Sequence, residues 1–158
     1  MKSGDNTFSV EKPEESSGFL LWQVTNLWQR EIKKALEAYG LTHSQFVLLA
    51  SIHWLALNKQ DVTQIVLSAH TKIDPMTTST VLRTLQRKGF IQRHEHLTDT
   101  RAKTVALTED GIKMIKNAVI TVEKFDRDFF SLLGDKTTEL NKNLSILLDY
   151  KEKLKIEV

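Results

Sequence analysis

The sequence of 158 residues contains no cysteine. This absence excludes disulfides, thiolate metal sites, cysteine nucleophiles and redox sensing by a thiol. The sequence also lacks an apolar run long enough for a signal peptide or a membrane span, and residues 1–17 are largely polar. We therefore expect a soluble protein without a membrane partner, which is not exported and works in the reducing environment of the cytoplasm.

A large net charge is also absent, because 22 basic and 20 acidic residues leave only +2. The distribution along the chain is less even. Residues 70–103 hold seven basic and three acidic side chains, a local charge of +4, so the other 15 basic and 17 acidic residues carry −2. A local basic excess is typical of a surface that meets nucleic acid, although a solvated face is the commoner explanation of a charge cluster.

The chain does have enough apolar residues, 41%, for one globular domain with a core of its own. These residues recur with helical spacing in several segments. Residues 1–15 lack the periodicity, and we expect them to be a disordered tail. The predicted helices cover residues 17–39, 42–58, 61–70, 74–89, 108–133 and 140–154.

Capping residues place the starts of three of these helices. Thr42 and Gln45 have the spacing of a capping box, and Asp61 is a candidate cap for the short third helix. Asp74 is the candidate cap of the fourth helix, with Pro75 at the first helical position, where a missing N–H costs nothing. The third and fourth helices are thus joined by a tight turn.

The period of the pattern changes after the fourth helix. Residues 90–95 and 102–107 read as two strands of a β-hairpin with its tip at residues 97–101. Two short helices joined by a tight turn and followed by a hairpin make a winged helix-turn-helix, whose second helix enters the major groove of DNA. The predicted fold is therefore mainly α with a small β-hairpin wing.

The fourth helix divides into two faces when its residues are placed at 100° steps. Thr78, Val81, Leu82 and Leu85 fall on one side. The other side is rich in hydroxyl groups, and either it contacts DNA or it is simply solvated. Threonine is a poor helix former, so the concentration of threonines favours DNA contact. The candidate base-reading residues are Thr77, Ser79, Thr80, Arg83 and Thr84.

Cationic side chains near this helix are candidates for phosphate contacts that position the protein on DNA. In the hairpin, Asp99 can pair with Arg93 or Arg101 and stiffen the loop, which leaves a guanidinium to enter a narrow minor groove. An exposed ion pair of little consequence is the alternative interpretation of these three residues. The candidate phosphate contacts are Lys72, Arg87, Lys88 and Lys103.

From Leu20 to about Leu154, the sequence resembles the MarR family of transcriptional regulators. The residues that carry the resemblance are the run 77–85, the segment Arg87-Lys88-Gly89-Phe90-Ile91 with Arg93, the pair Asp99-x-Arg101, and Leu107-Thr108-x-x-Gly111. Each fragment is weak alone, and together they are fairly specific. The chain departs from many relatives at Thr80, where those relatives have an arginine that reads guanine, so the operator sequence is left open.

The resemblance implies a homodimer that binds a pseudo-palindromic operator in double-stranded DNA and represses transcription until a small aromatic or anionic effector releases it. Residues 16–40 and 109–158 would be the intertwined dimerisation helices, and residues 41–108 the DNA-binding lobe. The large apolar side chains of the terminal helices suit a second buried surface, with a thick core within one chain as the alternative. No effector-binding residue is predicted.

Other classes of function fit less well. His94 and His96 share one side of a strand near Glu95, but an isolated His-x-His on an exposed wing is weak support for a metal site. No phosphate loop, nucleophile elbow or carboxylate pair is present, so we expect neither an enzyme nor a cofactor. The main alternative to a DNA-binding regulator is a winged helix that binds only proteins, for example as an antagonist of a true regulator.

Overall fold

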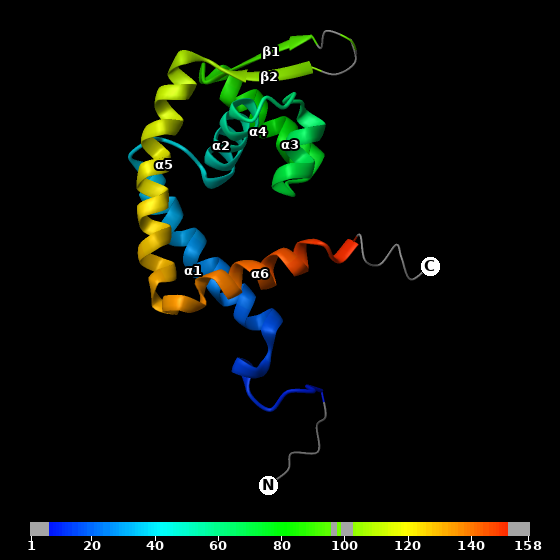
Figure 1. Ribbon diagram of the computed structural model, residues 1–158, viewed down its shortest axis with the longest axis vertical. Coiled ribbons are helices and arrows are strands. Elements are labelled where there is room, and N and C mark those ends of the chain that lie inside the picture. The colour runs from blue at the N-terminus through cyan, green and yellow to red at the C-terminus, as the bar shows by residue number, and fades with distance from the viewer. Residues whose placement is uncertain (1–6, 96–97, 99–102, 152–158) are drawn as a thin grey trace. The chain divides into compact units, whose positions relative to one another are not determined.

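The computed structural model describes residues 7–95, 98 and 103–151. It is mainly helical with one two-stranded antiparallel hairpin, which confirms the predicted fold class (Figure 1). None of the described helices is both long and apolar enough to cross a membrane. The elements are η1 (Pro13–Glu15), α1 (Ser17–Glu37), α2 (His43–Leu57), α3 (Gln64–Thr71), α4 (Pro75–Arg87), β1 (Ile91–Glu95), β2 (Lys103–Leu107), α5 (Glu109–Phe130), η2 (Ser131–Lys136) and α6 (Thr137–Leu148).

Two of the predicted helix starts are confirmed by the cap hydrogen bonds. The Thr42 hydroxyl accepts from the N–H of Gln45 at 3.2 Å, and the Gln45 side chain accepts from the N–H of Thr42 at 3.2 Å, which is a complete capping box for α2. The Asp74 carboxylate accepts from the N–H of Thr77 at 2.9 Å and begins α4. Gly89 follows α4 with φ of +78°, a conformation that glycine adopts without strain.

The predicted cap of α3 is wrong. Thr63, two residues after Asp61, caps this helix by accepting from the N–H of Val66 at 3.2 Å. Val62 and Thr63 are extended because they pair with β2: the carbonyl of Val62 accepts from the N–H of Val105 at 2.7 Å. A cap at Asp61 would have put Val62 into the helix and removed this strand pairing.

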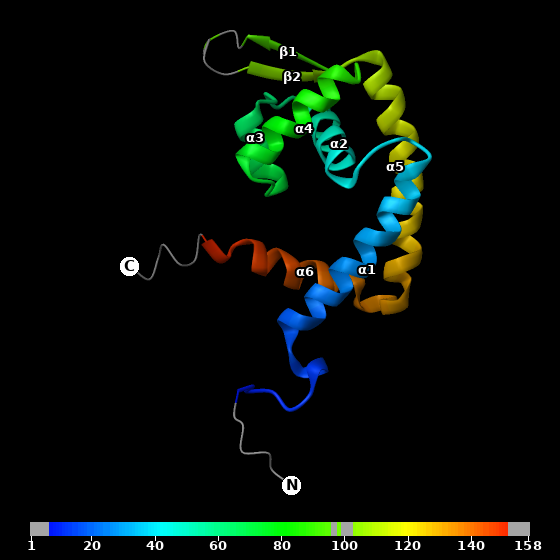
Figure 2. The same cartoon turned by 180° about the vertical axis from the view of Figure 1, so that it is seen from behind.

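The hairpin forms where it was predicted. Its register pairs Ile91 with Leu107 and Glu95 with Lys103, and the predicted tip falls mainly outside the described residues. Both views show the hairpin lying along the group formed by α2, α3 and α4 (Figures 1 and 2). β1 packs against α4, and β2 packs against α2 and α3. The wing is therefore attached directly to the helix-turn-helix.

A single apolar core holds the helix-turn-helix and the wing together. Its fully buried members come from every helix of this part of the chain, from α1 to α5. Fully burying a side chain of this size contributes about 1.5–3 kcal/mol, so the core provides a rigid support for the α4 surface. These residues are Ile32, Leu36, Leu48, Leu49, Ile52, Leu67, Leu82, Leu85 and Ile115.

The chain divides into two compact units, residues 1–122 and residues 123–158. In the second unit, the helix predicted to reach residue 133 ends as an α-helix at Phe130, and a 3-10 segment with a kink at Gly134 (φ +58°) leads into α6. The ring of Phe129 lies 5.7 Å from that of Phe125 and 5.1 Å from that of Phe130. The predicted end of the last helix, at Leu154, lies outside the described residues.

Candidate nucleic-acid interface

The α4 helix has one buried and one solvent-facing side, and three of the four residues that the 100° placement puts on the core side are buried, whereas Val81 is half-buried. Leu82 and Leu85 are fully buried, and so is Thr78, whose hydroxyl donates to the carbonyl of Ile73 at 3.4 Å. A polar side chain is tolerated in the core because this hydrogen bond satisfies its donor. The five candidate base-reading residues are exposed or half-buried: Thr77, Ser79, Thr80, Arg83 and Thr84.

The threonines on the exposed side hold the arginines in place. Nη2 of Arg83 donates to the Thr80 hydroxyl at 3.3 Å, and Nη2 of Arg87 donates to the Thr84 hydroxyl at 3.2 Å. A depression on the surface of α4 is lined by Thr80, Arg83, Gln86 and Arg87. In the part of the chain that the structure describes, neither arginine forms a salt bridge with an acidic residue. The guanidinium groups are thus oriented by hydrogen bonds but not neutralised. The sequence pattern did not indicate that the threonines position these arginines.

The turn before α4 is held by several side chains, which fixes the angle between α3 and α4. Lys72 ends α3 with φ of +62° and is exposed to solvent. The Ser68 hydroxyl donates to the carbonyl of Ile73 at 2.7 Å. At the start of α4, the hydroxyl and the N–H of Thr77 donate to the Asp74 carboxylate and hold the pKa of that carboxyl below its ordinary value. The helix therefore begins at one defined position relative to the turn.

The hairpin adds cationic groups beside α4. Lys103 is exposed at the start of β2, whereas Arg93 is half-buried in β1. Burial lowers the pKa of the Arg93 guanidinium, and the positive charge of Arg83 lowers it further. Asp99 and Arg101 lie outside the described residues. The structure thus brings Arg93 towards the α4 arginines.

Lys88 differs from the other candidate phosphate contacts. Its ammonium donates to the carbonyl of Gly40 at 2.8 Å and to Oε1 of Gln45 at 3.1 Å. Lys88 follows the half-buried Val81 by seven residues and lies on the same helical side, although Lys88 itself is exposed. Two of its three donors therefore connect the end of α4 to the loop between α1 and α2 and to the first turn of α2.

The surroundings of His94 bear on the metal site considered above. Its ring nitrogen lies 3.1 Å from Oε1 of Gln92 on the exposed hairpin, and His96 lies outside the described residues. The described residues contain no group of three or more side chains that could hold a metal ion.

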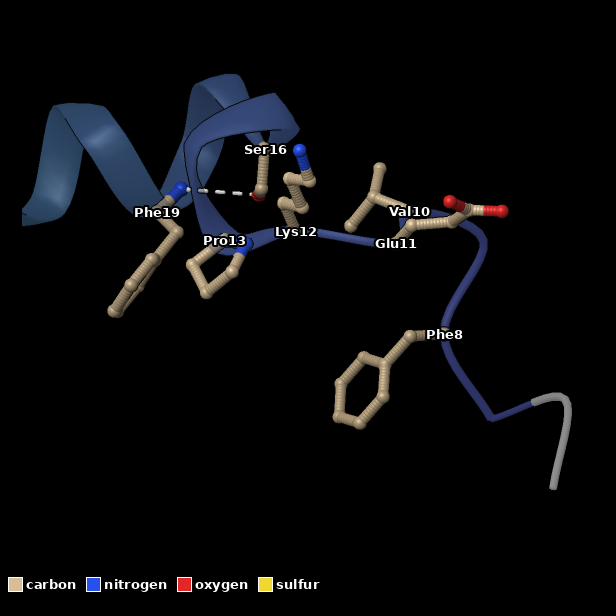
Figure 3. A pocket seen from close by; sticks show the side chains of 7 residues that line it. All are labelled: Phe8, Val10, Glu11, Lys12, Pro13, Ser16 and Phe19. Atoms are coloured by element: carbon tan, nitrogen blue, oxygen red, sulfur yellow. Dashed lines mark hydrogen bonds between the residues drawn. The ribbon is translucent and has the colours of Figure 1, made fainter. Parts of the chain in front are cut away.

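A second depression lies where the N-terminal segment meets α1. The rings of Phe8, Pro13 and Phe19 point to the same side of the segment, and the Ser16 hydroxyl caps α1 by accepting from the N–H of Phe19 at 3.3 Å (Figure 3). Phe8 is 82% exposed. This depression is mainly apolar and differs in character from the cationic surface of α4.

Comparison with known proteins identifies the family. Residues 37–124 match a family model described as an ArnR1-like winged-helix domain. The chain is 44% identical over 129 residues to the HTH-type transcriptional regulator YdcH of Bacillus subtilis, covering 82% of this chain and 88% of that protein. More than half of the chain thus matches a winged-helix model, and a relative at 44% identity matches 82% of the chain.

Solved structures agree with this assignment at the level of the fold. A MepR–DNA complex of S. aureus superimposes with a TM-score of 0.77 at 22% identity, covering 88% of this chain and 99% of that one. A MarR-family transcriptional regulator of Rhodococcus sp. RHA1 gives 0.73 at 23% identity, covering 89% and 96%. The chain described here belongs to the ArnR1-like winged-helix family of HTH-type transcriptional regulators, and it has the fold of the MarR-family structures.

Proposed function

We propose that this protein is a homodimer that binds a pseudo-palindromic operator in double-stranded DNA and represses transcription from it. The observation that carries the proposal is the exposed side of α4, where Arg83 and Arg87 are oriented by threonine hydroxyls and lack an acidic partner among the described residues. Oriented guanidinium groups without a counter-charge on a helix of a winged helix-turn-helix suit the major groove.

The roles of the side chains follow from their positions. Thr77, Ser79, Thr80 and Thr84 lie along the solvent-facing side of α4, where hydroxyls can donate to or accept from base edges. Exposed cations around this helix, at Lys72, Arg87 and Lys103, would contact phosphates and set the register without reading sequence. Arg101 at the tip of the wing would enter the minor groove, with Asp99 stiffening the loop. Lys88 is better suited to holding α4 in place than to contacting DNA.

A dimer is supported by large apolar side chains that are exposed on each unit taken separately. On α1, Trp22 is 68% exposed and Leu21 54%, and the apolar depression at Phe8 and Phe19 adds to this surface (Figure 3). On α6, Leu147 is 65% and Leu148 63% exposed. Exposed apolar side chains of this size suit surfaces that a second chain covers. In a two-fold dimer, the two copies of α4 would meet half-sites about 34 Å apart, one turn of the duplex.

Regulation by a small aromatic or anionic effector completes the proposal. It rests on the family alone. We propose the cytoplasm as the site of action, where the operator is available to the dimer.

The test is selection of binding sites from a pool of random duplexes at two salt concentrations. A palindromic motif with an affinity that falls steeply with salt is expected. Arg87→Ala should weaken all sites alike and reduce the salt slope by about 1, whereas Thr80→Ala should change the ranking of sites. Lys116→Ala removes a charge of the same sign from the exposed side of α5 and is the matched control. No enrichment at either salt would favour the protein-binding module instead.

A further inference from the structure

Arg83 on α4 and Arg93 on β1 lie close enough for their positive charges to interact. We infer that Arg83 and Arg93 together bind one phosphate of the DNA backbone, at the junction of α4 and β1. This inference rests on the proposed function and assigns Arg83 a role in positioning DNA instead of the base reading expected from the sequence.

The first observation is the direction in which Arg93 faces. In the hairpin register, Arg93 lies opposite Val105, which is 4% exposed, and it follows the buried Ile91 by two residues. Residues two apart on a strand share a face. Arg93 is therefore on the inner face of the wing, the face that packs against α4, and its side chain is half-buried.

The second observation is that this guanidinium has unused donors. Nε and Nη2 of Arg93 are both buried, and neither has a hydrogen-bond partner among the described residues. Buried polar groups without a partner are rare in folded proteins and costly when they carry charge. Two adjacent donors on one edge of a guanidinium have the geometry that binds two oxygens of one anion.

The third observation is the sign of the nearby charge. Arg83 acts on Arg93 with a like charge, so the two guanidinium groups repel each other in the free protein. The carboxylate of Asp74, at the other end of α4, already accepts two hydrogen bonds from Thr77. An anion placed between two arginines would remove their repulsion and satisfy the buried donors.

A phosphodiester is the anion that this surface would meet in a complex with DNA. It has one negative charge and two free oxygens, which match the two donors of Arg93 while leaving the charge shared with Arg83. Because the site joins α4 to β1, one phosphate held there would fix the position of the recognition helix relative to the wing. The alternative occupant is the carboxylate of Asp99 from the wing of the same chain.

The experiment is a double-mutant cycle that combines neutralisation of single phosphates in the selected operator with substitution of single arginines in the protein. A set of duplexes is prepared in which one phosphodiester at a time is replaced by a neutral methylphosphonate, and dissociation constants are measured for the wild type, Arg83→Gln, Arg93→Gln and the control Arg87→Gln. We expect one position in each half-site at which neutralisation weakens the wild type by roughly ten- to hundredfold. The same neutralisation should weaken Arg83→Gln and Arg93→Gln by less than about threefold, while Arg87→Gln should still show the full loss.

A second measurement separates this role from a purely structural one. The buried donors of Arg93 have no partner among the described residues of the free protein. The thermal unfolding midpoint of free Arg93→Met should therefore equal or exceed that of the free wild type. Equal losses for the wild type and both variants at every phosphate would overturn the inference. A second result would also overturn it: Arg93→Met lowers the unfolding midpoint, and the double variant with Asp99→Asn lowers it by less than the sum of the two single changes. Arg93 would then be paired with Asp99 in the free protein. Absence of any operator binding by the wild type would instead refute the proposed function itself.

Discussion

Replacement of Gly111 by alanine should weaken the junction between the wing and α5. Gly111 lies in the first turn of α5, and a Cβ built on it would lie 2.0 Å from the carbonyl oxygen of Phe90 and 3.0 Å from its carbon. These are backbone atoms, so the overlap cannot be relieved by rotating a side chain. The same oxygen accepts from the N–H of Thr108 at 3.0 Å, and the Thr108 hydroxyl donates to the carbonyl of Gly89 at 2.6 Å.

The magnitude follows from three effects. Forcing atoms into a packed site costs typically 1–3 kcal/mol, and the weakened Thr108 hydrogen bond costs about 0.5–1.5 kcal/mol more. Alanine favours the helix by about 1 kcal/mol over glycine and offsets part of this. We therefore expect Gly111→Ala to lower the free energy of unfolding by about 0.5–3.5 kcal/mol.

Urea unfolding measures this free energy, at one fixed protein concentration because the stability of a dimer depends on it. Gly18→Ala is the matched control: Gly18 is also in a helix, nothing lies within 4 Å of its added Cβ, and stabilisation by about 0.5–1 kcal/mol is expected. The same substitution should thus act with opposite signs at the two positions. If Gly111→Ala unfolded at the same or a higher urea concentration than the wild type, the close approach of α5 to Phe90 would be refuted.

Three further predictions concern α3 and α4. Lys88→Met should lower the free energy of unfolding by about 1 kcal/mol through loss of the bonds to Gly40 and Gln45 and leave the salt slope of DNA binding unchanged; a smaller slope would make Lys88 a phosphate contact. Thr63→Ala should cost about 0.5–2 kcal/mol in urea unfolding and Thr63→Ser much less, whereas equal midpoints for all three proteins would exclude Thr63 as the cap. Because the pKa of the Asp74 carboxyl is lowered in the folded protein, its contribution to stability is present above the ordinary pKa of 3.8 and is lost as the pH falls through the lower folded value. The difference in unfolding midpoint between the wild type and Asp74→Asn should therefore shrink on acidification, and a constant difference would contradict this.

Much of the fold could be predicted because the signals are local. The capping box at Thr42 and the Asp74-Pro75 start of α4 use side chains and backbone groups within one helical turn, so their geometry depends little on the rest of the chain. The hairpin was found from a change of period after Gly89. The cap of α3 was missed because Asp61 and Thr63 are both good capping residues, and only the pairing of Val62 and Thr63 with β2 selects between them.

The candidate site shows the same division. Burial on α4 follows the helical period, so the sequence separated the core side from the exposed side correctly. It could not show that Lys88 reaches Gly40, 48 positions earlier, or that Thr80 and Thr84 orient the arginines one turn later. The first contact joins distant segments, and the second depends on which rotamers the arginines adopt.

By itself, the sequence determined the helices, the hairpin and the side of α4 that faces solvent, because periodicity and caps act over a few residues. The tertiary structure alone decided which cation meets oxygen atoms of other segments and which does not. Lys88 and Arg93 are both basic residues near the end of α4, yet Lys88 finds two acceptors and the buried donors of Arg93 find none among the described residues. That difference arises from where the packed core places each side chain relative to oxygen atoms supplied by other segments, which a linear sequence does not specify.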